Sequence, residues 1–165
     1  MSNVFKVGII TASDKGYEGL REDLSGQVIE EIVTKAGYQV VSRKILPDDM
    51  DALMDEMIRL SDKEHVDLIL TTGGTGLSPR DNTPEATLKI ATKQVPGISE
   101  AMRAYSMTIT KRGMLSRGVS VMRDRTLIIN LPGSPKAVRE SLEYIIDELE
   151  HALLIMSGSV GECAR

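Results

Sequence analysis

Residues 71–81 carry the groups that binding of an anionic ligand would need. Two threonines precede the glycine-rich loop 73–76, Gly-Gly-Thr-Gly, and Arg80 and Asp81 follow it. Glycine permits positive φ angles and lets a ligand approach the backbone, so the loop offers hydroxyl and N–H groups without obstruction. The segment 83–85, Thr-Pro-Glu, predicts a helix start with threonine as the N-cap and proline as the first helical residue. A glycine loop, a charged pair and a helix N-terminus together favour an anion-binding site.

The loop matches neither of two common phosphate-binding motifs. The Walker motif requires a lysine after its last glycine, and no lysine follows Gly76. The pattern Gly-x-Gly-x-x-Gly also fails, because Ser78 and Pro79 stand where its third glycine would be. A tight turn without a ligand is therefore an alternative interpretation. The neighbouring charged pair and helix start favour a ligand loop.

Two further polar segments follow predicted strands. Ser13 and Asp14 come soon after the apolar residues 4–10, and the segment 130–135, Asn-Leu-Pro-Gly-Ser-Pro, ends the apolar run 126–131. Loops after parallel strands gather at one edge of a sheet, so these segments and the glycine loop are expected to share a crevice. An ordinary polar loop or strand-to-helix turn is the alternative in each case.

The segment 130–135 has features of its own that suit an anion. Gly133 allows close approach of a ligand to the backbone, and N–H groups at the start of the last helix can bind a phosphate. Lys136 and Arg139 add positive charge nearby. The proline at position 135 would suit a helix start even without any ligand.

Two aspartates are candidate metal ligands. Asp48 follows the second predicted strand, and Asp81 follows the glycine loop. Two carboxylates in one crevice could hold Mg²⁺, which prefers oxygen ligands and substrate phosphates to an all-protein cage. Helix capping is the alternative for Asp48, and a turn is the alternative for Asp81. His65 and His151 are isolated and are predicted to be structural or surface residues.

The spacing of apolar residues predicts the elements that would position these groups. Strands are predicted over 4–10, 38–46, 66–70 and 126–131. Helices are predicted over 24–36, from the aspartates at 48–51 to 58, over 84–93, over 98–109 and from 135 through 156, with a turn at 115–118. Strands alternate with helices, which indicates crossover connections and a mainly parallel sheet covered on both faces. The predicted fold class is α/β, as a three-layer α/β/α sandwich.

The composition narrows the class of protein. A chain of 165 residues with 41% hydrophobic and 27% charged residues predicts one globular domain over residues 1–165. The formal net charge of −4 argues against non-specific nucleic-acid binding, so an anionic substrate would need local positive groups. The single cysteine, Cys163, cannot form an internal disulfide. It is interpreted as a residue without a functional role rather than as a nucleophile. No apolar run is long enough for a membrane span and no signal sequence is evident, so a cytoplasmic enzyme or binding protein is expected.

With these residues described, the chain resembles the MogA/MoaB family of molybdenum-cofactor biosynthesis proteins. The most specific match is Thr-Thr-Gly-Gly-Thr-Gly followed by Arg-Asp-x-Thr-Pro-Glu-Ala-Thr, within residues 71–87. A similar likeness extends to the pterin-adenylating domains of gephyrin-like fusion proteins of plants and animals. Asn82 stands where the family often has an apolar β-branched residue, and Asp49 replaces a common glutamate. The matching stretches, in the family's order, are 8–14, 46–49, 71–87, 96–97, 115–117 and 127–136.

The resemblance implies a MogA-like molybdopterin-binding domain with molybdopterin adenylyltransferase activity. Molybdopterin would attack the α-phosphate of ATP, giving adenylylated molybdopterin and pyrophosphate. Asp48 and Asp81 would be the catalytic residues and the ligands of Mg²⁺. Ser106, Ser116 and Asn130 match positions that line the pterin or nucleotide site. The full set of candidate binding residues is Ser13, Asp14, Thr72, Gly73, Gly74, Thr75, Gly76, Arg80, Ser106, Ser116, Asn130, Pro132, Gly133 and Ser134.

The resemblance also implies partners. A homotrimer or a dimer of trimers is expected, and a separate protein is expected to insert molybdenum. No nucleic-acid or membrane partner is expected. Two other functions stay open: an inactive MoaB-type paralogue that binds molybdopterin or its precursor without turnover, and a structural oligomer whose glycine loop is only a turn. The presence of both aspartates favours the enzyme.

Overall fold

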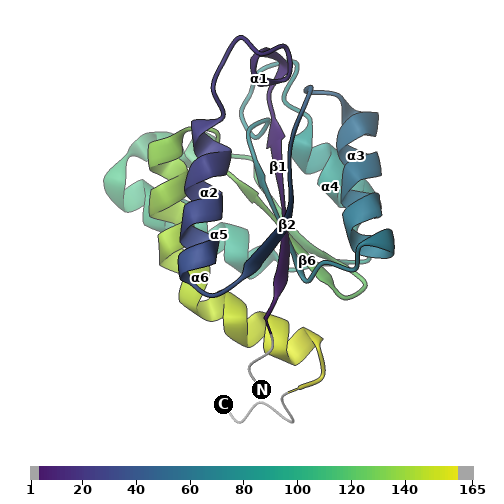
Figure 1. Cartoon of the computed structure of the whole chain (residues 1–165). Helices are drawn as coiled ribbons and strands as arrows, with labels where there is room; N and C mark the ends of the chain where they lie inside the picture. The colour runs from purple at the N-terminus through teal and green to yellow at the C-terminus, as the bar shows by residue number, and fades with distance from the viewer. Residues whose placement is uncertain (1–3, 160–165) are drawn as a thin grey trace.

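The computed structural model describes residues 4–159, and its centre is a six-stranded sheet with helices on both faces (Figure 1). The strand order is β2-β1-β3-β6-β5-β4. Cys163 lies outside the described residues. The strands are β1 (Lys6–Ala12), β2 (Gln39–Leu46), β3 (Leu68–Thr72), β4 (Lys93–Gln94), β5 (Ser120–Arg123) and β6 (Thr126–Leu131).

Four of the strands are parallel, as the alternation of strands and helices predicts. β1 pairs with β2 on one side and β3 on the other, and β3 pairs with β6. Strands β3 and β6 are buried along their whole length, which explains why they appear in the sequence as continuous apolar runs. Because the register aligns Thr11 with Thr72 and Thr72 with Leu131, these strands end at one edge of the sheet.

The other two strands were not predicted. β5 is antiparallel to β6, and β4 is antiparallel to β5, so the sheet is mixed. Strand β5 has only two apolar residues between Ser120 and Arg123, and β4 has two exposed residues, so neither gives a hydrophobic run. A tight turn with Asp124 at a φ of 49° joins β5 to β6.

The helices form two layers. α2, α5 and α6 cover one face of the sheet, and α3 and α4 cover the other (Figure 1). This confirms the predicted three-layer arrangement. The helices are α1 (Asp14–Tyr17), α2 (Leu24–Lys35), α3 (Met50–Ile58), α4 (Thr83–Ile90), α5 (Pro96–Ile109) and α6 (Pro135–Met156), with a π-helical turn η1 (Arg59–Lys63) and a 3₁₀ turn η2 (Lys111–Leu115).

Each layer buries an apolar stripe against the sheet. Ile29 of α2 and Leu142 of α6 are fully buried on one face, and Leu53 and Met57 of α3 are buried on the other. Burial of each such side chain stabilises the fold by about 1.5–3 kcal/mol. Among residues 4–159, no helix is both long enough and apolar enough to cross a membrane.

Candidate functional site

A cleft of about 560 Å³ lies at the carboxyl ends of the parallel strands. It is lined by residues from the segments that follow β1, β2, β3 and β6, as the predicted crevice requires. Its lining includes Asp48, Asp81 and the glycines of two different loops. The cleft therefore collects the polar segments that the sequence places at separate strand ends.

The glycine loop depends on two glycines with positive φ. Gly73 has a φ of 86° and Gly74 a φ of 70°, a region that other residues rarely adopt. A Cβ on Gly73 would lie 2.3 Å from the carbonyl oxygen of Ala12, and a Cβ on Gly74 would lie 2.2 Å from Thr83 Oγ1. The loop can therefore pass close to β1 and α4 only with glycine at both positions.

The threonine hydroxyls that flank this loop stabilise the structure, whereas the N–H groups of the loop are available. Thr72 Oγ1 donates to the carbonyl of Pro132 at 2.6 Å, and Thr83 Oγ1 donates to the carbonyl of Gly73 at 3.0 Å. Within the described part of the chain, the N–H groups of the 74–76 segment donate to no protein acceptor. Polar groups without a protein partner need water or a ligand. The predicted free N–H groups are confirmed.

Thr83 does not have its predicted capping role. α4 begins at Thr83 itself, and Asn82 occupies the N-cap position without a side-chain hydrogen bond. The Thr83 hydroxyl instead bonds to Gly73. This bond joins α4 to the glycine loop, so the start of α4 is tied to the edge of the cleft.

Two long helices point their N-termini at the cleft. The first turns of α2 and α6 contribute Leu24, Ser25 and Pro135 to its lining, and the N-caps Asp23 and Ser134 also line it. The first N–H groups of a helix have no partner within the helix, and the dipole makes this end partly positive. An anion in the cleft would meet favourable charge from both helices.

Asp48 is not a helix cap. Asp49 caps α3 by accepting a hydrogen bond of 2.8 Å from Ala52 N. Asp48 Oδ2 accepts a bond of 3.0 Å from Asp14 N, while Asp48 N donates to Asp14 Oδ1 at 2.9 Å. The other oxygen, Oδ1, lies 3.4 Å from where a Cβ on Gly74 would be. The structure thus removes the alternative role of Asp48 and places its carboxylate beside the glycine loop.

The pKa of Asp48 lies above its ordinary value. Burial is the main cause, and the charges of Asp14 and Asp81 act in the same direction. The hydrogen bond from the Asp14 backbone acts in the opposite direction but does not cancel them. A carboxylate in this position gains from a nearby cation, because a cation offsets the charge that burial and the two aspartates disfavour.

Asp81 has both of the roles that its sequence position suggests. Its Oδ2 accepts a hydrogen bond of 3.0 Å from Ser78 N and so closes the turn 78–81. The same side chain lines the cleft, and its charge acts on Asp48. The two aspartates are therefore brought together.

The pair of carboxylates fits a hard divalent cation shared with a substrate. Residues 4–159 contain no cluster of three or more His, Cys, Asp or Glu side chains arranged to hold a metal. Mg²⁺ commonly binds with one or two carboxylates and completes its shell with waters and phosphates. The two aspartates are the residues that could hold such an ion.

Arg80 and Asp14 form an ion pair. Arg80 Nε and Nη2 each donate to the Asp14 carboxylate at 2.9 Å, and this bonding holds the pKa of Asp14 below its ordinary value. The Arg80 side chain is 62% exposed. Ser13 is the N-cap of α1, where it accepts a bond from Gly16 N. These three side chains therefore also hold the loop after β1 in place.

A second, smaller cavity holds four of the other predicted residues. Its volume is about 30 Å³, room for one or two waters, and it lies among α5, η2 and β6. Asn130 Nδ2 donates to Thr71 Oγ1 and Thr87 Oγ1 at 3.0 Å, and its Oδ1 accepts from Val119 N. The Asn130 side-chain amide thus already forms hydrogen bonds within the protein through both its oxygen and its nitrogen. The four residues are Ser106, Ser116, Asn130 and Pro132.

The predicted binding residues therefore separate into groups. Those that line the large cleft are Ser13, Thr72, Gly73, Gly74, Gly133 and Ser134, together with Asp48 and Asp81. Thr75 and Gly76 lie farther along the loop, where their carbonyls accept hydrogen bonds from Arg117. Arg139 pairs with Glu31 and Glu143 between α2 and α6, away from the cleft lining.

The comparisons with known proteins identify the family. Residues 8–151 match the family model described as a probable molybdopterin binding domain. The chain belongs to the MogA/MoaB family. The molybdopterin adenylyltransferase of Helicobacter pylori strain 26695 is 37% identical over 155 residues, covering 93% of this chain and 88% of the relative. The molybdopterin adenylyltransferase of Escherichia coli K12 is 37% identical over 148 residues, covering 88% and 75%.

A solved structure of the MogA/MoaB family has the same fold. The molybdopterin biosynthesis enzyme MoaB from Thermus thermophilus superimposes with a TM-score of 0.89 and 46% identity. The match covers 94% of this chain and 98% of that one. The cleft between the strand ends is therefore built on the fold of this family.

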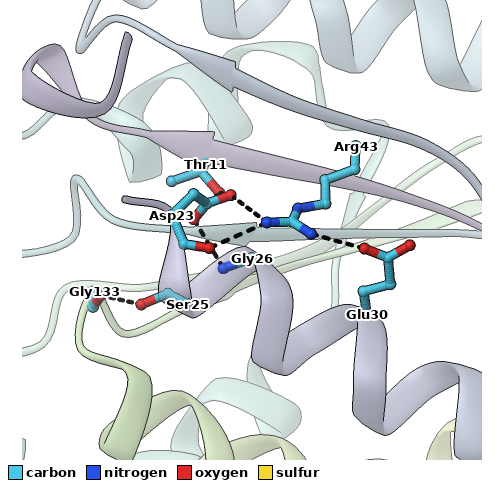
Figure 2. A network of polar contacts seen from close by, with 7 residues as sticks. All are labelled: Thr11, Asp23, Ser25, Gly26, Glu30, Arg43 and Gly133. Carbon is cyan, nitrogen blue, oxygen red and sulfur yellow. Dashed lines mark hydrogen bonds and ion pairs between the residues drawn. The ribbon is translucent and has the colours of Figure 1, made fainter. Parts of the chain in front are cut away.

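A polar network at the floor of the cleft was missed from the sequence. Asp23 accepts hydrogen bonds from Thr11 Oγ1 at 3.0 Å, from Gly26 N at 2.9 Å and from Arg43 Nη2 at 3.3 Å (Figure 2). Ser25 Oγ donates to the carbonyl of Gly133 at 2.7 Å. The network joins β1, β2 and the starts of α2 and α6. An aspartate just before the predicted helix 24–36 was an available N-cap signal.

Proposed function

We propose that this MogA/MoaB-family protein transfers AMP from ATP to molybdopterin in the cleft at the carboxyl edge of its sheet. The observation that carries the proposal is the meeting of Asp48 and Asp81 with free loop N–H groups and two helix N-termini. This combination binds phosphates and a divalent cation at one place. The activity named for the Helicobacter pylori and Escherichia coli relatives supports the same conclusion.

The reaction is a phosphoryl-centre displacement. A terminal phosphate oxygen of molybdopterin forms a bond to the α-phosphorus of ATP, and the bond from that phosphorus to the bridging oxygen of pyrophosphate breaks. Pyrophosphate leaves with the bonding electron pair. The attacking oxygen is already anionic, so no protein side chain has to become a covalent nucleophile.

The chain's own groups position and neutralise the phosphates. The N–H group of Gly74 in the cleft lining and the first turns of α2 and α6 provide donors for phosphoryl oxygens, and the N–H groups of residues 75 and 76 follow along the same loop. Removing one donor that stabilises developing charge in an enzyme site typically costs about 3–4 kcal/mol of activation free energy. Several such donors in one cleft are therefore sufficient for a large effect on rate.

Mg²⁺ is the proposed metal, held by Asp48 and Asp81 together with phosphate oxygens. When bound, it supplies positive charge to the departing pyrophosphate. Asp48 suits this role because burial and neighbouring charges already raise its pKa, so its ionised form gains from a cation. Its reciprocal hydrogen bonds with Asp14 hold the carboxylate in a fixed orientation.

We also propose that the protein is a homotrimer, or a dimer of trimers, in the cytoplasm. Large apolar side chains are exposed on α5, η2 and α6, and α5 contacts both of the other two elements. Tyr105 and Tyr144 stack between α5 and α6 with ring centroids 4.1 Å apart. Exposed apolar patches of this kind support self-association. The exposed side chains are Met107, Ile109, Met114, Leu115 and Tyr144. We propose that a separate protein inserts molybdenum.

The proposal is tested with ATP labelled at its α-phosphate. Purified protein is incubated with Mg²⁺ and molybdopterin, and the label is followed into the pterin. Asp48→Asn should abolish transfer, whereas Asp51→Asn, which changes an exposed aspartate of α3, should not. Wild-type protein that binds molybdopterin but transfers no label would instead be the non-catalytic paralogue.

A further inference from the structure

Arg117 holds the glycine loop from outside the cleft. It lies between η2 and β5, and it is not among the residues that line the cleft. Its backbone N–H donates to the carbonyl of Thr75 at 2.9 Å, and its Nε donates to the carbonyl of Gly76 at 2.8 Å. Its Nη2 donates to the carbonyl of Asp81 at 2.9 Å. One residue therefore bonds to both ends of the loop that carries Asp81.

The segment between these two ends is exposed, and the ion pair of Arg80 with Asp14 is one restraint on it. Leu77 is 67% exposed, and residues 78–80 are also exposed. Inside the segment, the turn is closed by hydrogen bonds between Ser78 and Asp81. The Arg80–Asp14 ion pair is exposed and restrains the turn only weakly, so the backbone of the turn can still move unless its ends are held. The bonds from Arg117 to Gly76 and Asp81 supply this restraint.

The hydrogen bonds from Arg117 also orient peptide groups. In a trans peptide the N–H points opposite to the C=O. A carbonyl of Thr75 or Gly76 directed at Arg117 therefore turns the N–H of Gly76 or Leu77 away from it. The Gly76 N–H is among those without a protein acceptor in the described part of the chain. Arg117 thus determines the direction in which the loop presents a free donor.

Glu85 fixes the guanidinium itself. Its Oε1 accepts from Arg117 Nη1, and its other carboxylate oxygen, Oε2, is buried without a hydrogen-bond partner in the described residues. A buried carboxylate oxygen without a partner is unfavourable, so the guanidinium of Arg117 is the group that compensates the charge of Glu85. Lysine cannot replace the arginine, because only the planar guanidinium presents donors to three separate acceptors in this arrangement.

We propose that Arg117 is a positioning residue for adenylyl transfer: it fixes both ends of the 76–81 segment and thereby holds Asp81 and the loop N–H groups against the phosphates of ATP. This inference rests on the proposed function. Arg117 touches neither substrate nor metal in this account. Its effect passes through the backbone of the loop.

The test compares Arg117→Lys with Arg123→Lys. Arg123 is a matched control, because its guanidinium bridges the Asp62 carboxylate and the Ile90 carbonyl at the opposite edge of the sheet. Arg117→Lys should lower kcat for pterin adenylylation by on the order of 10–100-fold, the usual effect of a small misplacement of reacting groups. Amide hydrogen exchange over residues 76–81 should become faster, while molybdopterin affinity stays within about twofold of wild type. Arg123→Lys should change neither readout.

A second variant distinguishes a loss of positioning from a folding defect. Glu85→Gln retains Arg117 but weakens its orientation, and it should show the same two changes at smaller size. Unchanged exchange over 76–81 in Arg117→Lys would overturn the proposal, as would faster exchange with unchanged kcat. A wild-type protein without turnover would overturn the proposed function instead. Without turnover, the positioning role can still be tested by itself. It would be overturned if Arg117→Lys changed neither the amide hydrogen exchange of residues 76–81 nor the affinity for ATP.

Discussion

The sheet has a hollow at each end of its parallel strands, and the two have similar volumes. The cleft at the carboxyl ends measures about 560 Å³, and the hollow at the amino ends of β3 and β6 measures about 640 Å³. Both contain aspartates and arginines. Volume and residue type alone would therefore favour neither as a binding site.

The two hollows differ in how their polar groups are satisfied. At the amino ends, Arg123 forms a paired bond with Asp62 at 3.0 and 2.7 Å, and Thr126 Oγ1 donates to the carbonyl of Val66. The Ser61 hydroxyl is the exception, being buried without a partner in the described residues. At the carboxyl ends, by contrast, the N–H groups of residues 74–76 donate to no acceptor within residues 4–159, and the first turns of α2 and α6 line the cleft. A ligand site is recognised here by donors that the fold leaves unpaired.

The largest effect is expected from Gly74→Ala in the cleft at the carboxyl ends. The substitution forces an alanine into a φ of 70° and places its Cβ 2.2 Å from Thr83 Oγ1. We expect adenylylation to fall at least about 100-fold and the free energy of unfolding to fall by about 1–3 kcal/mol. Urea unfolding and the adenylylation rate measure the two effects. Gly37→Ala is the control, because Gly37 has a φ of 92° but a Cβ there would meet no atom within 4 Å, and the residue lies away from the cleft.

A smaller effect is expected from Asp23→Asn at the floor of the cleft. The Asp23 side chain is 4% exposed and accepts bonds from three groups, so the neutral amide leaves at least one donor poorly satisfied. The free energy of unfolding should fall by about 1–3 kcal/mol, and activity should fall about tenfold as the start of α2 shifts. Glu30→Gln, at the exposed end of the same network, should cost less than about 1 kcal/mol. Equal losses in the two variants would contradict the assigned role of Asp23.

The smallest effect is expected from Asp62→Asn in the opposite hollow. The hydrogen bond from Arg123 holds the pKa of Asp62 below its ordinary value of 3.8. Because the folded-state pKa is lower than the unfolded one, Asp62 stabilises the fold above about pH 4, and this contribution is lost as pH falls through the folded pKa. The difference in unfolding free energy between wild type and variant should be about 0–1 kcal/mol at pH 7 and vanish in acid. A difference that grew as the pH fell would contradict this assignment.

Much of the fold could be predicted because its strongest signals are local. The buried parallel strands appear as apolar runs, and α6 has its predicted bounds because proline starts it and Gly158 follows its end. Strands β1 and β3 nevertheless end two residues later than predicted. Thr71 and Thr72 look like loop residues, but their hydroxyls are satisfied by Asn130 and Pro132 from a neighbouring strand and the loop after it.

The site could be predicted in outline but not in its supporting contacts. The glycines and both aspartates are recognisable from residue type and spacing. The roles of Arg117 and Arg43 depend on bonds to residues 41 and 20 positions away, which no local pattern reveals. Sequence also could not distinguish Asp48 from Asp49 as the cap of α3, because both are suitable residues at adjacent positions.

The assignment of the carboxyl-end cleft as the active site is best tested by measuring pyrophosphate release from ATP with Mg²⁺ and molybdopterin. The proteins compared are wild type, Asp81→Asn and Asp62→Asn. The two substitutions make the same chemical change in the two hollows. We expect pterin-dependent release that falls at least about 100-fold in Asp81→Asn and stays at the wild-type rate in Asp62→Asn. Wild-type turnover in a folded Asp81→Asn variant, or its loss in Asp62→Asn, would contradict the assignment of the cleft as the active site.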